Sequence, residues 1–138
     1  MKHLEHDLQV RFFRVVRIAS NRDARLKAIY ATPNASKRDY KHAASLKAEG
    51  LTKGVLDICA PLKGKNGEPG MYIEMKIKGN YLSPEQIEFW NMVESQGYVC
   101  RLCYSTEEAV CAVESYLGIS IMVHQKSQRL RPGVSRTT

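Results

Sequence analysis

The chain has 138 residues, 43% of them hydrophobic and 25% charged, a composition typical of one globular domain with its own core. An apolar run of about 18 residues, the minimum for a membrane-spanning helix, is absent, and so is the apolar core of a secretory signal, so we expect a cytoplasmic protein. The formal net charge of +7 favours a polyanionic partner, because neutralising phosphates releases condensed counterions.

The first third of the chain is predicted to hold two helices with a short strand between them. Apolar side chains recur at helical spacing near the N-terminus, and a basic helical pattern ends at a glycine. The expected elements are a helix over residues 4–19, a strand over 27–32 and a basic helix over 37–49.

The middle of the chain is predicted to form a β-hairpin. The apolar run over residues 54–62 is interrupted by Asp57, a Gly-rich turn follows, and residues 71–79 alternate between apolar and polar. Side chains on a strand alternate faces, so Glu74 and Lys76 share a face. Alternation alone indicates only a half-buried strand with a solvated charged side.

The last part of the chain is predicted to hold a helix, a strand and a helix. Ser83 and Pro84 start the first helix, and Ser105 and Glu108 stand in capping-box register at the start of the second. The resulting order predicts an α/β domain with a mixed sheet flanked by helices. We expect this domain over residues 1–120 and a basic, flexible tail over 121–138.

The chain contains four cysteines, two of them in C-x-x-C spacing. Residues three apart on a strand face opposite ways, and a second ligand pair for a tetrahedral zinc site is absent. We therefore expect buried, reduced thiols at Cys59, Cys100, Cys103 and Cys111.

Two acidic residues of the predicted hairpin point to chemistry. Asp57 interrupts an apolar strand, where an unpaired carboxylate costs several kcal/mol unless a lysine or a metal ion compensates it. The hairpin could place Asp57 and Glu74 face to face, and two close carboxylates gain proton affinity unless a cation lies between them. A divalent ion with oxygen ligands would satisfy both. A third acid, Glu5, lies at the edge of the apolar stripe of the first helix, although a solvated surface glutamate explains it equally well.

An ordered set of spaced motifs covers most of the chain: a glycine approaching Asp57, a Glu-x-Lys strand, a Ser-x-x-Gln helix start, a Gly-Tyr turn and a final capped helix. These motifs resemble the VRR-NUC domain, a nuclease module of the PD-(D/E)xK superfamily with a restriction-endonuclease-like fold. They occupy residues 54–57, 74–76, 83–86, 97–98 and 105–117.

The resemblance implies a role for each matching residue. Asp57 and Glu74 would bind Mg²⁺ or Mn²⁺, together with the backbone carbonyl of Met75 and with Glu5, which matches the N-terminal helix glutamate and is followed by Gln9. Lys76 would orient or deprotonate the attacking water. Gln86 matches a glutamine of the family and would complete the catalytic set with Asp57, Glu74 and Lys76. From its spacing, Gln86 could equally complete a capping box with Ser83.

Two positions depart from the family pattern. Leu56 stands where a proline usually precedes the aspartate, and Asn34 lacks its usual glycine neighbours. Proline would have supplied no ligand, so its absence should leave catalysis intact. The departure at Asn34 leaves open what the 32–38 loop does.

Together with this resemblance, the residues predict a metal-dependent, structure-specific DNA endonuclease for branched DNA. The resemblance to stand-alone members of the family further implies Holliday junctions as substrate and a homodimer. Backbone contacts to DNA are expected from Lys37, Arg38 and Lys41, although a basic helix face is often simply solvated. A non-catalytic nucleic-acid-binding protein on the same fold is the first alternative. A basic interaction module that depends on the C-terminal tail is the second.

Overall fold

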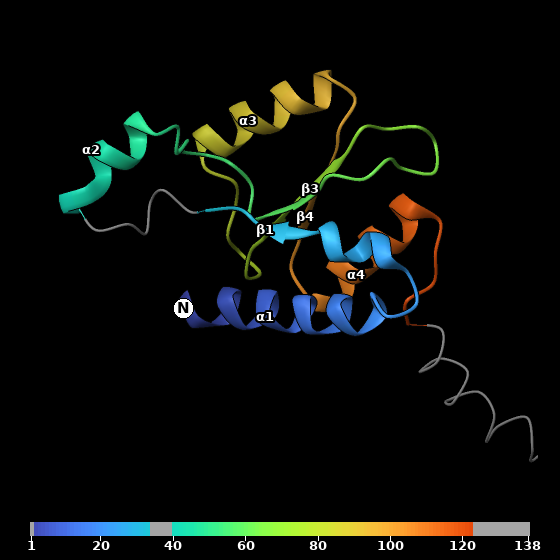
Figure 1. The fold of residues 1–138 in the computed structure, drawn as a ribbon. Coiled ribbons are helices and arrows are strands. Elements are labelled where there is room, and N and C mark those ends of the chain that lie inside the picture. The colour runs from blue at the N-terminus through green and yellow to red at the C-terminus, as the bar shows by residue number, and fades with distance from the viewer. Residues whose placement is uncertain (1, 34–39, 123–138) are drawn as a thin grey trace, which may run out of the picture.

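The computed structural model describes residues 2–33 and 40–122. Its elements surround one sheet, with helices on both sides (Figure 1). Along the chain they are α1 (Lys2–Ala19), the 3-10 helix η1 (Ala24–Ala28), β1 (Tyr30–Ala31), α2 (Tyr40–Ala48), β2 (Ile58–Ala60), β3 (Met71–Met75), α3 (Pro84–Ser95), β4 (Val99–Cys103) and α4 (Thr106–Leu117).

The four strands of the described chain lie in the order β1-β2-β3-β4. β1, β2 and β3 are successively antiparallel, whereas β3 and β4 are parallel and are joined through α3. The sheet is therefore mixed, and the predicted hairpin is the β2–β3 pair. This confirms the α/β class expected from the order of elements.

The hydrophobic core lies between the sheet and the α1–α4 layer. Phe12 and Val16 of α1 are fully buried and belong to one cluster with Ile73 and Met75 of β3 and Val110 of α4. Figure 1 shows α1 and α4 on one side of the sheet and α3 on the other. The apolar parity of β3 thus packs against α1 and α4, as its alternation predicts, and the opposite parity faces α3.

The predicted strand over residues 27–32 is mostly wrong, because η1 occupies its first part. The Asp23 carboxylate accepts a hydrogen bond from the Arg25 backbone N–H at 3.1 Å and pairs with the Arg25 guanidinium at 2.8 Å. These two contacts between Asp23 and Arg25 start a helical turn in which Leu26 is buried. β1 then begins only at Tyr30 and ends at Ala31.

The helix starts predicted by serine caps are confirmed at α3 and α4. Ser83 caps α3 through a reciprocal capping box, and the Ser105 hydroxyl accepts the Glu108 N–H at 3.1 Å. In a capping box the Glu108 carboxylate would accept the backbone N–H of Ser105. In α4 it accepts the backbone N–H of the preceding residue, Tyr104, at 3.2 Å.

The prediction of buried, reduced thiols is confirmed for three cysteines and wrong for the fourth. Cys59, Cys100 and Cys103 are buried on strands, whereas Cys111 is exposed on α4, and all are free thiols. The residues on either side of Cys111, Val110 and Ala112, contact the core instead. Cys111 therefore lies on the solvent side of an amphipathic helix.

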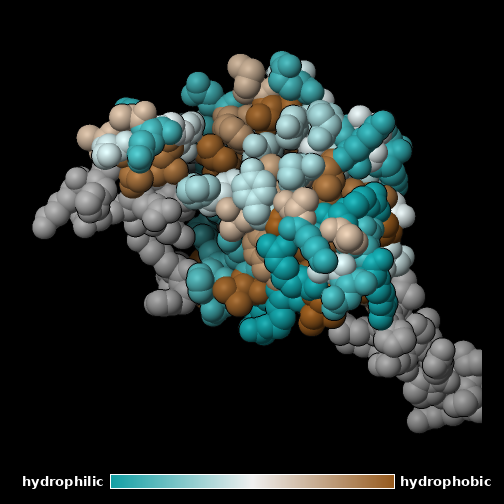
Figure 2. Space-filling model, in the orientation of Figure 1, coloured by the Kyte–Doolittle hydropathy of each residue, from teal (hydrophilic) through white to brown (hydrophobic). Residues whose placement is uncertain are grey.

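The surface in view is mainly hydrophilic, with scattered hydrophobic residues (Figure 2). Among residues 2–33 and 40–122, a helix that combines the length and the apolar character needed to cross a membrane does not occur.

Candidate active site

Asp57 and Glu74 face each other across the β2–β3 hairpin. Ile58 pairs with Ile73, so Asp57 and Glu74 are the next opposed positions in that register. The Asp57 backbone N–H donates to Glu74 Oε1 at 3.0 Å, and the Met75 backbone N–H donates to Asp57 Oδ2 at 3.0 Å. Each carboxylate therefore accepts a backbone hydrogen bond from the other strand, which fixes both at the end of the ladder.

The Glu74 carboxylate is buried, with only 2% of the residue exposed. Gln86 Nε2 donates to Glu74 Oε2 at 2.8 Å, and Lys76 Nζ lies 3.5 Å from the same oxygen. The Lys76 side chain is itself mostly buried, at 17% exposed. These contacts offset part of the desolvation cost of the carboxylate.

The environment raises the pKa of Glu74 to about 7. Burial is the largest cause, and the charge of Asp57 is the second, while Lys76 and the hydrogen bonds from Asp57 and Gln86 act in the opposite direction. Burial and the nearby Asp57 charge together therefore favour the protonated form of Glu74. A cation bound beside the carboxylate would favour the ionised form instead.

Gln86 makes the contact that each of its two predicted roles requires, while its part in catalysis stays a prediction. Its Oε1 accepts the Ser83 backbone N–H at 2.9 Å, and its Nε2 donates to Glu74. Because α3 begins at this point, the capping box holds the amide in the orientation that contacts the carboxylate.

The acid pair opens into a cavity of about 360 Å³, which we call the acid cavity. Lys76, Glu5 and Gln9 also line it, and Glu5 Oε1 accepts a hydrogen bond from Asn80 Nδ2 at 3.4 Å. Within residues 2–33 and 40–122, His, Cys, Asp and Glu do not form a metal-binding group of three. Glu5 therefore shares the cavity without joining the acid pair, and its ligand role stays a prediction.

Two ionisable residues of the acid cavity were missed from the sequence, His6 and Lys53. Lys53 Nζ lies 3.4 Å from the Glu85 carboxylate at the start of α3. Gly54 has φ +94°, and a Cβ there would lie 2.6 Å from the Glu85 carbonyl oxygen. This close approach packs the segment before Asp57 against α3. Lys53 could have been found from the sequence, because it directly precedes Gly54, the motif glycine that leads to Asp57.

The predicted DNA-binding residues lie in or beside the part of the chain that the structure leaves out. Lys37, Arg38 and Asn34 are outside the described residues. Lys41 lies on α2, but its side chain is outside the described set. Their role in binding the DNA backbone stays a prediction.

Comparison with known proteins identifies the family and a similar fold. The family described as "VRR-NUC domain" matches residues 2–107. A solved structure described as "VRR_NUC domain protein" is similar in fold, with a TM-score of 0.65 and 21% sequence identity over 84% of this chain and 89% of the other. A search of curated proteins returns no match.

Proposed function

The chain belongs to the VRR-NUC family of nuclease domains, and from this premise we propose that it hydrolyses DNA phosphodiester bonds with the help of Mg²⁺ or Mn²⁺. The observation that carries the proposal is the opposed pair of Asp57 and Glu74, held beside Lys76 in a solvent-connected cavity. A purely structural role would not favour a buried Glu74 carboxylate facing the Asp57 carboxylate, whose charge raises the pKa of Glu74.

The residues of the site fit a divalent cation with oxygen ligands. Mg²⁺ in phosphoryl-transfer sites is usually held by one or two carboxylates, with waters and substrate phosphate oxygens completing the shell. Asp57 and Glu74 would supply the carboxylates, with Glu5 and the Met75 carbonyl as further predicted ligands. When bound, the cation would lower the pKa of a water molecule and neutralise charge that develops on the phosphate.

The side chains around the pair have separate tasks in this proposal. Lys76 donates to the attacking water and stabilises negative charge on the phosphate oxygens. Gln86 fixes the orientation of the Glu74 carboxylate from the start of α3. Lys53 lines the same cavity and, in this proposal, contacts the phosphate backbone.

The preferred substrate in this proposal is branched DNA, including Holliday junctions. In this proposal the acid cavity engages the phosphodiester through Lys76, Lys53 and the cation that the acid pair would hold. These groups contact phosphate and carry no information on base identity, so DNA shape is the property to be recognised. A four-way junction presents two equivalent strands for cutting. A homodimer would supply one site for each strand.

The proposal is tested by incubating the protein with single-stranded, duplex, flap and four-way junction DNA in the presence of Mg²⁺ or Mn²⁺. Glu74→Gln and Asp57→Asn remove one charge each and should abolish cutting. Glu88→Gln, on the exposed side of α3, is the matched control and should cut normally. Equal cutting by wild type and Glu74→Gln would reject the proposed mechanism, and DNA binding that EDTA leaves unchanged, without cutting, would favour the non-catalytic alternative.

A further inference from the structure

A row of tyrosine and cysteine side chains crosses the sheet beside the acid pair. The strand registers pair Tyr30 with Cys59 and Cys59 with Tyr72, so these side chains share one face. Asp57 is two residues before Cys59, and Glu74 is two residues after Tyr72, which places the acid pair on the same face. Two residues along a strand span about 7 Å, so the two rows are neighbours.

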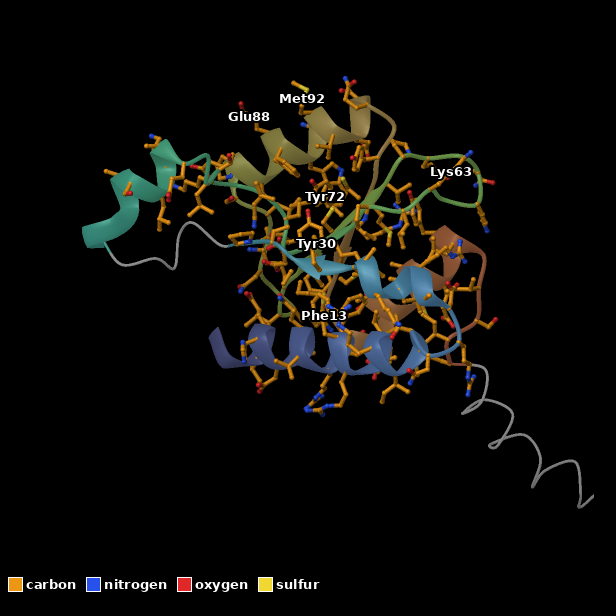
Figure 3. All side chains as sticks on the ribbon, viewed as in Figure 1. Phe13, Tyr30, Lys63, Tyr72, Glu88 and Met92 are labelled. Carbon is orange, nitrogen blue, oxygen red and sulfur yellow. The ribbon has the colours of Figure 1, made fainter. Side chains whose placement is uncertain are left out.

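One tyrosine of this row is fixed and the other is open. The Tyr72 ring meets the Phe89 ring edge-on at 5.0 Å between centroids and stacks on Tyr98 at 5.6 Å. Tyr30 lies on the edge strand β1, and 46% of it is exposed. Figure 3 shows both labelled tyrosines on the α3 side of the sheet, with Phe13 on the α1 side.

Tyr30 and Tyr72 line one cavity, here called the tyrosine cavity, with a volume of about 470 Å³. This volume lies within the range of small-ligand sites. Apolar side chains such as Leu51 form other parts of its wall. The tyrosine cavity and the acid cavity adjoin, because both are lined by Thr32, Pro33, Thr52 and Val55.

We propose that the tyrosine cavity binds one unpaired nucleobase of the DNA strand whose phosphodiester lies in the acid cavity. The inference rests on the proposed function, since the acid cavity is what places a phosphodiester beside the tyrosines. An aromatic ring accepts the flat face of any base, so Tyr30 recognises an unpaired base without reading its identity. Tyr72, held by its aromatic neighbours, forms the rigid wall.

This subsite gives the selection of DNA structure a physical basis. A base within a duplex is stacked on both sides and must be unstacked before it can enter a pocket, which costs a few kcal/mol. A base at a gap, flap or junction avoids much of this cost. The tyrosine cavity therefore favours DNA with an unpaired nucleotide next to the bond that is cut.

The test is fluorescence titration with 2-aminopurine DNA in EDTA, where cutting does not interfere. One probe carries 2-aminopurine as the unpaired base of a gapped duplex, and the other carries it paired. Wild type and Tyr30→Phe should quench the unpaired probe, whereas Tyr30→Leu should lose the quenching and bind this probe about 5- to 100-fold more weakly. The paired probe should not distinguish the variants. Tyr81→Leu, at a position 79% exposed and outside both cavities, is the matched control.

Wild-type affinity and quenching in Tyr30→Leu would overturn the inference, as would an equal loss on both probes. If Tyr30→Leu does not fold, photocrosslinking of wild type to 5-iodouracil at the unpaired position decides the matter. Attachment at Tyr30 or Tyr72 supports the subsite, and attachment elsewhere rejects it. Metal-dependent cutting without dependence on Tyr30 would reject the subsite alone, whereas Tyr30-dependent quenching in a protein that never cuts would reject only the nuclease mechanism.

Discussion

The pH dependence of the free energy of unfolding measures the contribution of the buried Glu74 carboxylate of the candidate site. Burial and the Asp57 charge raise the pKa of Glu74 to about 7 from an ordinary value of 4.5, so the folded chain binds this proton more tightly than the unfolded chain. The resulting stabilisation is fully present below pH 4.5 and is lost as the pH rises through about 7. At about 1.4 kcal/mol per pKa unit, the loss totals about 3 kcal/mol, most of it between pH 5 and pH 8.

Urea unfolding of metal-free wild type and Glu74→Gln measures this loss. Glutamine does not titrate, so the stability of wild type relative to Glu74→Gln should fall by about 2 to 3 kcal/mol between pH 5 and pH 8. The substitution can also change the free energy of unfolding by an amount that does not depend on pH, for example where the new amide faces the Gln86 donor. Such a constant amount cancels when the values at pH 5 and pH 8 are subtracted. Because Asp57 and Glu74 interact directly, the measured change belongs to the pair.

Glu88→Gln on the exposed side of α3 is the control and should follow wild type at every pH. Parallel pH profiles for wild type and Glu74→Gln, within about 0.5 kcal/mol, would refute the electrostatic reasoning, because a surface substitution commonly produces a change of that size.

Three further predictions concern the ligand, the start of α3 and the C-terminal tail. Millimolar Mg²⁺ or Mn²⁺ should raise the Tm of wild type but not of Asp57→Asn. The rise should be larger at pH 8 than at pH 6, because a proton on Glu74 competes with the cation. A Tm that is independent of metal at both pH values would contradict the site. Gln86→Glu keeps the capping box but loses the donor to Glu74, so DNA cutting should fall about 10- to 100-fold, whereas full activity in a cleavage assay would exclude this positioning role. Deleting residues 124–138 removes four basic side chains, which should weaken DNA binding and flatten its salt dependence in fluorescence anisotropy titrations, and an unchanged slope would exclude contact between the tail and phosphates.

Features of the fold that depend on local chemistry were predicted from the sequence. The Ser83 cap is an example, because its partners lie three residues away. The strand expected over residues 27–32 was correct only at residues 30–31, since a short apolar run fits a strand or a 3-10 turn equally well. The 3-10 turn forms because the Asp23 side chain, which lies before the apolar run, binds the backbone N–H and the guanidinium of Arg25.

The candidate site was predictable only as far as its contacts are local. The hairpin turn and the strand alternation were enough to oppose Asp57 and Glu74. The depth of burial of Glu74 was not predictable, because it depends on how α3 packs over the sheet and brings Gln86 to the carboxylate. Predicting the tyrosine cavity would have required the register of β1, β2 and β3. β1 has only two residues, too few for its sequence to indicate which strand it pairs with.

The exposed thiol of Cys111 makes the chain suitable for counting its copies on DNA. Cys59, Cys100 and Cys103 are buried, and burial raises the pKa of Cys100 and of Cys103 to about 11, so neither is readily alkylated near neutral pH. A maleimide dye should therefore attach once per chain, on α4. Cys111 is not among the residues that line the acid cavity, so the label leaves the lining of that cavity unmodified. Stepwise photobleaching of labelled protein on a four-way junction would then show one or two copies directly.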